Sequence, residues 1–152
     1  MPNTPAAIGR AITVACANPR ATPDQRQLCE MLLAAIGESA WVEDEALMDA
    51  VTAVSGSGPA YVFLLIEALA AAGAHAGLPE DLALRLALAT VAGAGELARQ
   101  SPDSPARLRE AVTSPGGTTR AALDVLMVEP GLADLLDRAV AAATARSREL
   151  AD

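Results

Sequence analysis

The sequence predicts a mainly α-helical fold, in which a short strand–helix–strand unit is followed by an array of helices. Apolar residues alternate with period two, as in half-buried strands, at residues 10–17, and a second short extended piece follows before residue 43. From about Asp44 onward, apolar segments are separated by breaks rich in Gly, Pro and Ser at 55–59, 77–79, 101–105, 114–117 and 130–131. Hydrophobic residues make up 52% of the chain but aromatic residues only 2%. The core must therefore be built largely from Ala, Leu and Val, of which the first two are strong helix formers.

The N-terminal unit opens with a predicted strand at residues 10–17, in which Ile12, Val14 and Cys16 share one face. Residues 40–42 offer a second short extended segment. Two strands alone are marginally stable and leave edges unpaired, so we expect this unit to be the edge of a larger sheet.

A helix is predicted between these two strands. Thr22 suits the N-cap, Pro23 the first helical position, and Gln25 the third position of a capping box. We expect this helix to end before Gly37.

Two later helices, at about 59–76 and 80–100, are apolar on nearly every face, with Glu67 and Arg85 as the main interruptions. A surface helix would carry a single apolar stripe, whereas these two need cover on all sides. A chain of 152 residues has too few other helices to enclose both. We therefore expect a second copy to cover them, in an obligate homodimer.

The residue inventory excludes several kinds of partner and site. The net charge of -8 argues against nucleic acid and against an anionic membrane surface as main partners. The chain contains no Lys, which rules out a Schiff-base or phosphate-loop lysine. Cys16, Cys29 and the single histidine, His75, do not form a metal-ligand spacing, so no metal site is expected. The cysteines are interpreted as small buried apolar residues.

Neither the N-terminal residues nor the most apolar stretch of the chain suggests a secreted or membrane protein. The opening residues 1–5 show no charged segment followed by an apolar one, so no secretory signal is expected and a cytoplasmic location is predicted. The most apolar stretch, 60–74, contains Glu67 and is shorter than the roughly 20 residues that span a bilayer. We interpret it as protein core.

Residues 93–98 fit the string G-x-G-x-x-A of dinucleotide-binding turns. That motif works only between a strand and the N-terminus of a helix, and here it falls inside a predicted helix. We interpret it as a small-residue face for helix packing.

Residues 114–119, Ser-Pro-Gly-Gly-Thr-Thr, are the strongest candidate for a binding site. Two glycines leave the main chain bare just before a predicted helix, whose first N–H groups lack partners and carry partial positive charge. This arrangement suits a small anion such as a carboxylate. An ordinary helix cap with a turn remains the alternative.

Three further features have both a structural and a functional interpretation. Residues 55–59, Ser-Gly-Ser-Gly-Pro, are expected to form a sharp corner, either as a tight connection between helices or as part of a site. His75 fits a helix C-terminus better than a catalytic role. Glu43, Asp44 and Glu45 suit a solvated first turn of a helix.

Five segments carry a family resemblance. Residues 1–6, 44–47, 49–52, 55–61 and 113–119 read MPNTPA, DEAL, DAVT, SGSGPAY and TSPGGTT, in that order. Together they resemble pyrroline-5-carboxylate reductase, an enzyme of proline biosynthesis that reduces 1-pyrroline-5-carboxylate to L-proline with NADPH or NADH. The resemblance runs over essentially the whole chain.

The resemblance implies roles for the residues at matched positions. The main chain at Ser114, Gly117 and Thr118 would bind the substrate carboxylate, and the Thr119 hydroxyl, assigned as catalytic, would bond the ring nitrogen. Glu45 would border the substrate. The nicotinamide cofactor would be bordered by Met1, Pro2, Asn3, Ser55, Gly56, Gly58 and Pro59.

The resemblance also implies a domain organisation. Residues 1–43 would be the C-terminal edge of a truncated Rossmann domain, and residues 44–152 a helical domain for substrate binding and dimerisation, with higher assembly of dimers possible. A fragment, a mis-assigned start or a split enzyme would each explain the missing part, and we expect no activity from the chain alone. The alternatives are a non-catalytic helical dimer and the C-terminal domain of a related dehydrogenase with another substrate.

Overall fold

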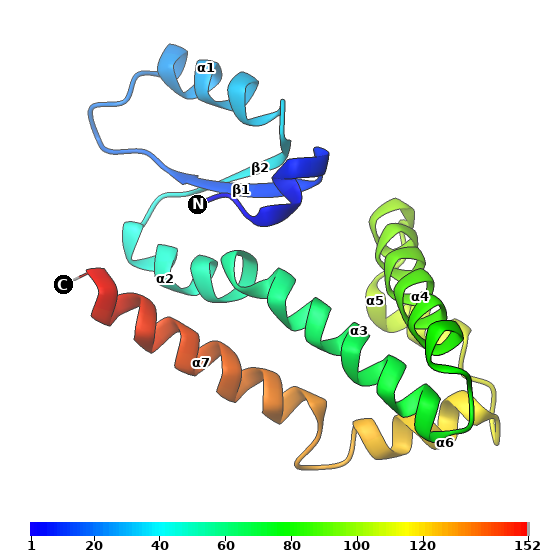
Figure 1. The fold of residues 1–152 in the computed structure, drawn as a ribbon. Coiled ribbons are helices and arrows are strands. Elements are labelled where there is room, and N and C mark those ends of the chain that lie inside the picture. The colour runs from blue at the N-terminus through cyan, green and yellow to red at the C-terminus, as the bar shows by residue number, and fades with distance from the viewer. Residues whose placement is uncertain (152) are drawn as a thin grey trace. The chain divides into compact units, whose positions relative to one another are not determined.

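A computed structural model describes residues 1–151 and confirms a mainly α-helical fold with one short sheet (Figure 1). In chain order the elements are η1 (Thr4–Ile8), β1 (Ala11–Cys16), α1 (Pro23–Leu33), β2 (Gly37–Val42), η2 (Glu45–Leu47), α2 (Met48–Val51), η3 (Thr52–Gly56), α3 (Gly58–His75), α4 (Glu80–Gln100), α5 (Pro105–Ala111), α6 (Thr118–Leu126) and α7 (Leu132–Ala151). Here η1 and η2 are 3₁₀ turns and η3 is a π-helical turn.

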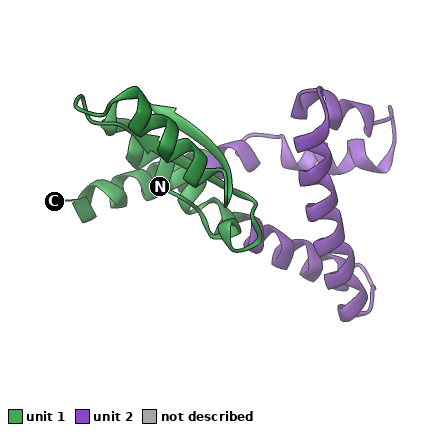
Figure 2. Cartoon of the chain, turned by 90° about the horizontal axis from the view of Figure 1, so that it is seen from above, with its two compact units in different colours: residues 1–61, 137–152 green, residues 62–136 purple. Residues whose placement is uncertain are grey.

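The chain forms two compact units, which Figure 2 shows in green and purple. Unit 1 consists of residues 1–61 and 137–152, and unit 2 of residues 62–136. The domain boundary expected after Glu43 stays a prediction.

In unit 1, β1 and β2 pair in parallel through a crossover that contains α1, with register from Ala11↔Gly37 to Cys16↔Val42. The capping box predicted for α1 is present: the Gln25 N–H donates to Thr22 Oγ1, and the Thr22 N–H donates to Gln25 Oε1. The second strand is longer than predicted. It begins at Gly37 because its first residues pair through the main chain, while the side chains of residues 38–40 are exposed and show no apolar pattern.

The single tryptophan joins α1 to β2. Trp41 Nε1 donates to Glu30 Oε1 over 2.8 Å, and the Arg26 guanidinium lies 5.4 Å from the centre of the indole ring. The Glu43 carboxylate accepts bonds from both terminal nitrogens of Arg26, and this raises the pKa of Arg26. The helix and the strand are therefore connected by polar contacts at an exposed surface.

The last helix returns to the beginning of the helical region within unit 1. Ser147 Oγ donates to Asp49 Oδ1 over 2.6 Å, and Arg148 Nε lies 3.7 Å from Asp49 Oδ2. One carboxylate on α2 thus fixes the end of α7, although the two segments are 98 residues apart in sequence.

A glycine is required at the first residue of β2. Gly37 has φ +148, and a Cβ added there would overlap the carbonyl oxygen and the nitrogen of Ala11, its partner in the ladder. Both atoms belong to the main chain, so the clash cannot be relieved by rotating a side chain.

We expect Gly37→Ala to destabilise unit 1 by about 3 kcal/mol or more, because positive φ and a main-chain overlap act together. The control is Gly9→Ala, where φ is +67 but a Cβ meets nothing within 4 Å. Denaturation followed by Trp41 fluorescence should show a loss of about 1 kcal/mol for the control. Equal losses in the two variants would contradict the steric argument.

The buried core of a single chain is small. Among the described residues, the buried apolar side chains are Ala11, Val14, Ala53, Ala83 and Ala87. On α3, by contrast, Phe63, Leu64 and Leu65 are 57%, 63% and 50% exposed. The helices α3 and α4 match the two predicted apolar helices in position, and their large side chains lack cover within one chain.

Candidate functional site

The first candidate site lies in unit 2, at the turn that leads into α6. The Gly117 N–H donates to the Ser114 carbonyl over 3.0 Å, which closes a four-residue turn with Pro115 second and Gly116 third. Gly116 has φ +71, the conformation that this turn type requires of its third residue and that glycine adopts without strain.

The turn leaves the N-terminus of α6 open. Gly117 is the N-cap residue and provides no side-chain cap. The first N–H after Gly117 that bonds back is that of Ala121, which donates to the Gly117 carbonyl over 3.2 Å. Within residues 1–151 the N–H groups of Thr118, Thr119 and Arg120 therefore have no recorded acceptor, at the end of the helix where the dipole is positive.

Space at this turn is tight at position 117. A Cβ built there would lie 2.5 Å from Ser114 Oγ and 3.1 Å from the Ser114 carbonyl oxygen. A cavity of about 270 Å³ adjoins the turn and is lined by Thr113, Ser114, Pro115, Gly116 and Arg120. Of the residues with bare N–H groups, Arg120 lines this cavity, whereas Gly117, Thr118 and Thr119 are not among its lining residues. Bare N–H groups at the start of a helix suit a small carboxylate.

The second candidate site lies in unit 1, where the N-terminal segment runs along the free edge of β1. The Met1 nitrogen donates to the Val14 carbonyl over 2.8 Å, and the Val14 N–H donates to the Met1 carbonyl over 3.0 Å. This mutual exchange is the hydrogen-bonded pair of an antiparallel ladder. Pro2, which has no N–H, occupies the position that makes no ladder bond.

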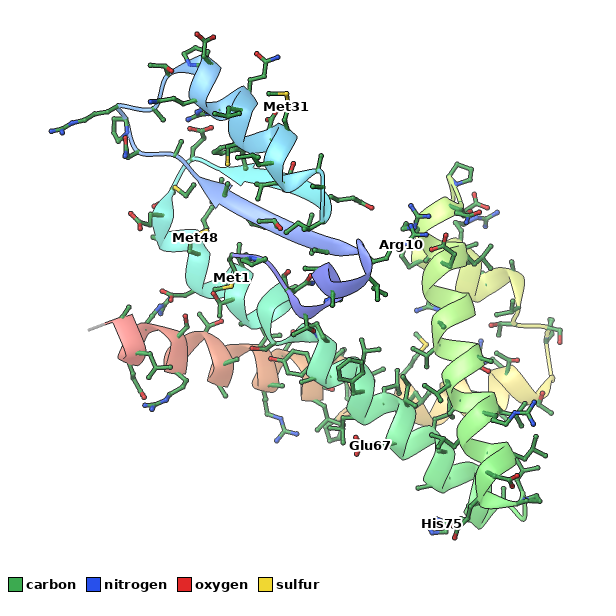
Figure 3. The ribbon with its side chains drawn as sticks, turned by 45° about the horizontal axis from the view of Figure 1, so that its top comes forward. Met1, Arg10, Met31, Met48, Glu67 and His75 are labelled. Carbon is green, nitrogen blue, oxygen red and sulfur yellow. The ribbon has the colours of Figure 1, made fainter. Side chains whose placement is uncertain are left out.

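The same segment contacts the π-helical turn η3. Asn3 Nδ2 donates to the Ser55 carbonyl over 3.3 Å, and Met1 Sδ lies 3.5 Å from the position of a Cβ on Gly56. Figure 3 shows Met1 beside this part of the helical run. Residues 1–3 and 55–56, more than 50 positions apart in sequence, thus lie together.

Residues 55–59 do not form the predicted sharp corner. The run from α2 to α3 is helical on both sides of Ser57 and passes through η3, in which the Ser57 N–H donates to the Thr52 carbonyl. Gly58 and Pro59 form the first turn of α3. The expectation of a corner is wrong because the chain stays helical through a π turn, whose hydrogen bond spans five residues where that of an α-helix spans four.

Glu45 lies in unit 1 with Met1 and Pro2, and all three line one cavity of about 430 Å³. Cys16 and Cys29 line it too and are half-buried, not fully buried as predicted. Asp44 caps η2 by accepting the Ala46 N–H, the helix-start role expected of this acidic stretch. The Glu45 carbonyl accepts the Met48 N–H, and its side chain has no recorded hydrogen bond within residues 1–151.

Sequence reasoning missed one contact near this site. The Tyr61 hydroxyl donates to the Ala53 carbonyl over 3.1 Å, and Ala53 is fully buried in η3. Tyr61 stands in the SGSGPAY segment, but nothing in the string points to a carbonyl eight residues earlier.

His75 and the G-x-G-x-x-A string lie where the sequence predicted them. His75 ends α3, and residues 93–98 lie inside α4. Within residues 1–151 no group of three or more potential metal ligands is found.

Comparison with known proteins gives one family. The family model for pyrroline-5-carboxylate reductase dimerisation matches residues 45–150. The chain is 49% identical to the pyrroline-5-carboxylate reductase of Synechocystis over 150 residues, which is 99% of this chain and 55% of that protein. It is 49% identical to the enzyme of Pisum sativum over 99% of this chain and 54% of that protein.

Solved structures agree. A pyrroline-5-carboxylate reductase from Coxiella burnetii matches with TM-score 0.94 and 41% identity, over 99% of this chain and 55% of that one. The Plasmodium falciparum pyrroline carboxylate reductase with NADP bound matches with TM-score 0.87 and 32% identity, over 100% of this chain and 62% of that one. The chain spans about half the length of the curated relatives it matches. By fold, sequence identity and the family match, the chain belongs to the pyrroline-5-carboxylate reductase family.

Proposed function

We propose that this chain supplies the substrate-carboxylate site and the dimer interface of an NAD(P)H-dependent reductase that converts 1-pyrroline-5-carboxylate to L-proline. The observation that carries the proposal is the open N-terminus of α6, where three N–H groups without recorded acceptors in residues 1–151 follow a turn whose third residue, Gly116, has positive φ. Relatives that share 49% identity with this chain bear the name of that enzyme.

The substrate carboxylate would bind to main-chain groups around Ser114, Gly117 and Thr118, as their geometry favours. Thr119 is half-buried in the first turn of the same helix, and its hydroxyl has no recorded partner within residues 1–151. From there it would bond the ring nitrogen. Glu45 is the further candidate for a residue bordering the substrate, since it lines an open cavity in unit 1.

Unit 1 offers residues that could border the nicotinamide ring of a cofactor, but none suited to its pyrophosphate among the described residues. Met1 and Asn3 contact the turn that contains Ser55 and Gly56, Pro2 lies between them in the chain, and Gly58 and Pro59 begin α3 just after the turn. We call these proposed cofactor residues the cofactor wall. Among the described residues the sheet has two strands, and the G-x-G-x-x-A string lies inside α4. These residues would therefore border the nicotinamide and leave the pyrophosphate to other groups.

The proposed reaction needs no strong general base from the protein. Bound NAD(P)H would supply the hydride that adds to the imine carbon. The imine nitrogen gains a proton in the same reaction, and a hydroxyl such as that of Thr119, relaying to water, suffices to hold it in place. The main contribution of the chain is to fix the substrate relative to the hydride donor, since positioning accounts for much of such a rate.

A homodimer would cover the apolar helices. The family match is to a dimerisation domain, and the exposed side chains of α3 and α4 supply a large apolar surface. The run Glu45–His75 is also long and apolar enough to cross a membrane by those two measures. We favour protein cover because Glu67 lies within the run and the matched domain is named for dimerisation. The cytoplasmic location and any assembly beyond the dimer stay predictions.

The function is tested by reconstitution. Residues 1–152 are mixed with a separately produced nucleotide-binding half of the Synechocystis relative, and oxidation of NADPH and of NADH is followed with 1-pyrroline-5-carboxylate as substrate. We expect turnover in the mixture and none from either part alone, because the described residues lack a pyrophosphate-binding turn. Calorimetric titration of the chain with L-proline should show weak binding. Absence of both binding and turnover would favour a non-catalytic helical dimer.

A further inference from the structure

Asn3 replaces a main-chain group at the edge of β1. In an antiparallel ladder the hydrogen-bonded pair after Met1–Val14 is residue 3 with residue 12. The Ile12 N–H does bond to Asn3, but it donates to the side-chain oxygen Oδ1 over 3.2 Å. The main-chain carbonyl of Asn3 instead accepts the Ala6 N–H over 3.1 Å and begins η1. The side-chain amide therefore completes the ladder while the main chain turns away.

The amide orientation follows from its neighbours. The Ile12 N–H can only donate, so the amide must present Oδ1 to it. The NH₂ group then points to Ser55, whose carbonyl lies 3.3 Å and whose Oγ lies 3.5 Å from Nδ2. One planar group thus connects the strand edge to η3.

The π-helical turn depends on contacts of this kind. Its own widened bond, from the Ser57 N–H to the Thr52 carbonyl, is supplemented by the Tyr61 hydroxyl on the Ala53 carbonyl and by Asn3 on the Ser55 carbonyl. Ala53 is fully buried, and Met1 Sδ packs against Gly56. Among the described residues, Asn3 makes the recorded polar contact between η3 and β1.

We propose that Asn3 is a positioning residue, which fixes the turn Thr52–Gly56 against β1 and thereby positions Ser55 and Gly56 of the cofactor wall. The proposal rests on the proposed function for the identity of the wall. The latch between Asn3 and η3 can be tested without cofactor or substrate, so its failure and a failure of the reductase function can be told apart.

A substitution by aspartate would separate the two hydrogen bonds of Asn3, the one that it accepts from Ile12 and the one that it donates to Ser55. Asn3→Asp keeps the oxygen that accepts the Ile12 N–H and loses the donor to the Ser55 carbonyl. When that carboxyl is protonated at low pH, it regains an O–H donor. The chain's other asparagine, Asn18, provides a matched control: its Oδ1 accepts the Arg20 N–H over 2.9 Å in an exposed turn.

The experiment is hydrogen exchange of the full chain, with the Ile12 and Ser57 amides as reporters. At neutral pH, Asn3→Asp should speed exchange at Ser57 about tenfold, the effect of one lost hydrogen bond, and leave Ile12 protected. At about pH 4 the difference at Ser57 should shrink as the carboxyl protonates, each rate being compared with unmodified chain at the same pH. Asn3→Ala should expose both amides at either pH, and Asn18→Asp should affect neither.

Two results would overturn the proposal. Unchanged exchange at Ser57 in both Asn3 variants would show that the amide does not hold η3. Equal acceleration at Ile12 and Ser57 in Asn3→Asp, without recovery at low pH, would show a general loss of stability in place of a specific latch.

Discussion

We expect Ala68→Glu to convert a dimeric chain into monomers at micromolar concentration. Leu64, Ala68 and Ala72 lie four residues apart on one face of α3, and Leu64 is 63% exposed in a single chain. If that face packs against a second copy, the new carboxylate becomes buried without a partner, at a cost of about 3–5 kcal/mol. Sedimentation velocity would then show a shift from dimer to monomer, or a loss of folded protein.

The matched control is Ala106→Glu, in the first turn of α5, where a negative charge suits the helix dipole. It should leave both sedimentation and thermal unfolding unchanged. A well-folded monomer of the unmodified chain at micromolar concentration would contradict the dimer, and an unaltered dimer in Ala68→Glu would place residue 68 outside the interface.

Gly117→Val should abolish binding of proline while the helices stay folded. A valine Cβ would lie 2.5 Å from Ser114 Oγ and 3.1 Å from the Ser114 carbonyl oxygen, so Ser114 must move, and the branched side chain would crowd the N–H groups at the start of α6. Because Gly117 has φ -78, an ordinary value, the backbone itself is not strained and helix content should persist. Calorimetric titration with L-proline measures the loss of binding, and far-ultraviolet circular dichroism measures the helix content.

Thr119→Val is the matched control for that experiment. It places the same side chain two residues later, removes one hydroxyl and leaves the bare turn intact. Its effect should be about 1 kcal/mol, a single lost hydrogen bond, and should fall on recognition of the ring nitrogen more than on the carboxylate. If Gly117→Val binds proline as tightly as Thr119→Val does, the carboxylate lies elsewhere.

Features set by neighbouring residues are the ones that could be predicted. The start of α1 depends on Thr22, Pro23 and Gln25, which lie within four positions of each other, and the structure has the predicted bonds. The turn before α6 is likewise contained in residues 114–117, so its open N–H groups could be anticipated from the string. Local chemistry sufficed in both cases.

Features set by distant residues could not be predicted. The π turn at Thr52–Gly56 is held by Asn3 and Tyr61, and nothing in residues 52–56 alone distinguishes it from a corner between helices. The first half of β2 was not predicted for a related reason. Its first residue, Gly37, belongs to the strand because its main chain pairs with Ala11, and such pairing leaves no apolar pattern in the sequence. The expected burial of Cys16 and Cys29 failed because α1 and the sheet cover them only in part.

The two aromatic chromophores have a consequence for spectroscopy. The single tryptophan, bonded to Glu30, and the single tyrosine, bonded to the Ala53 carbonyl, both belong to unit 1. Intrinsic fluorescence therefore reports on residues near the sheet and on the start of α3, and it is blind to residues 62–136. A melting curve recorded by fluorescence and one recorded by circular dichroism at 222 nm will coincide only if the two units unfold as one cooperative transition.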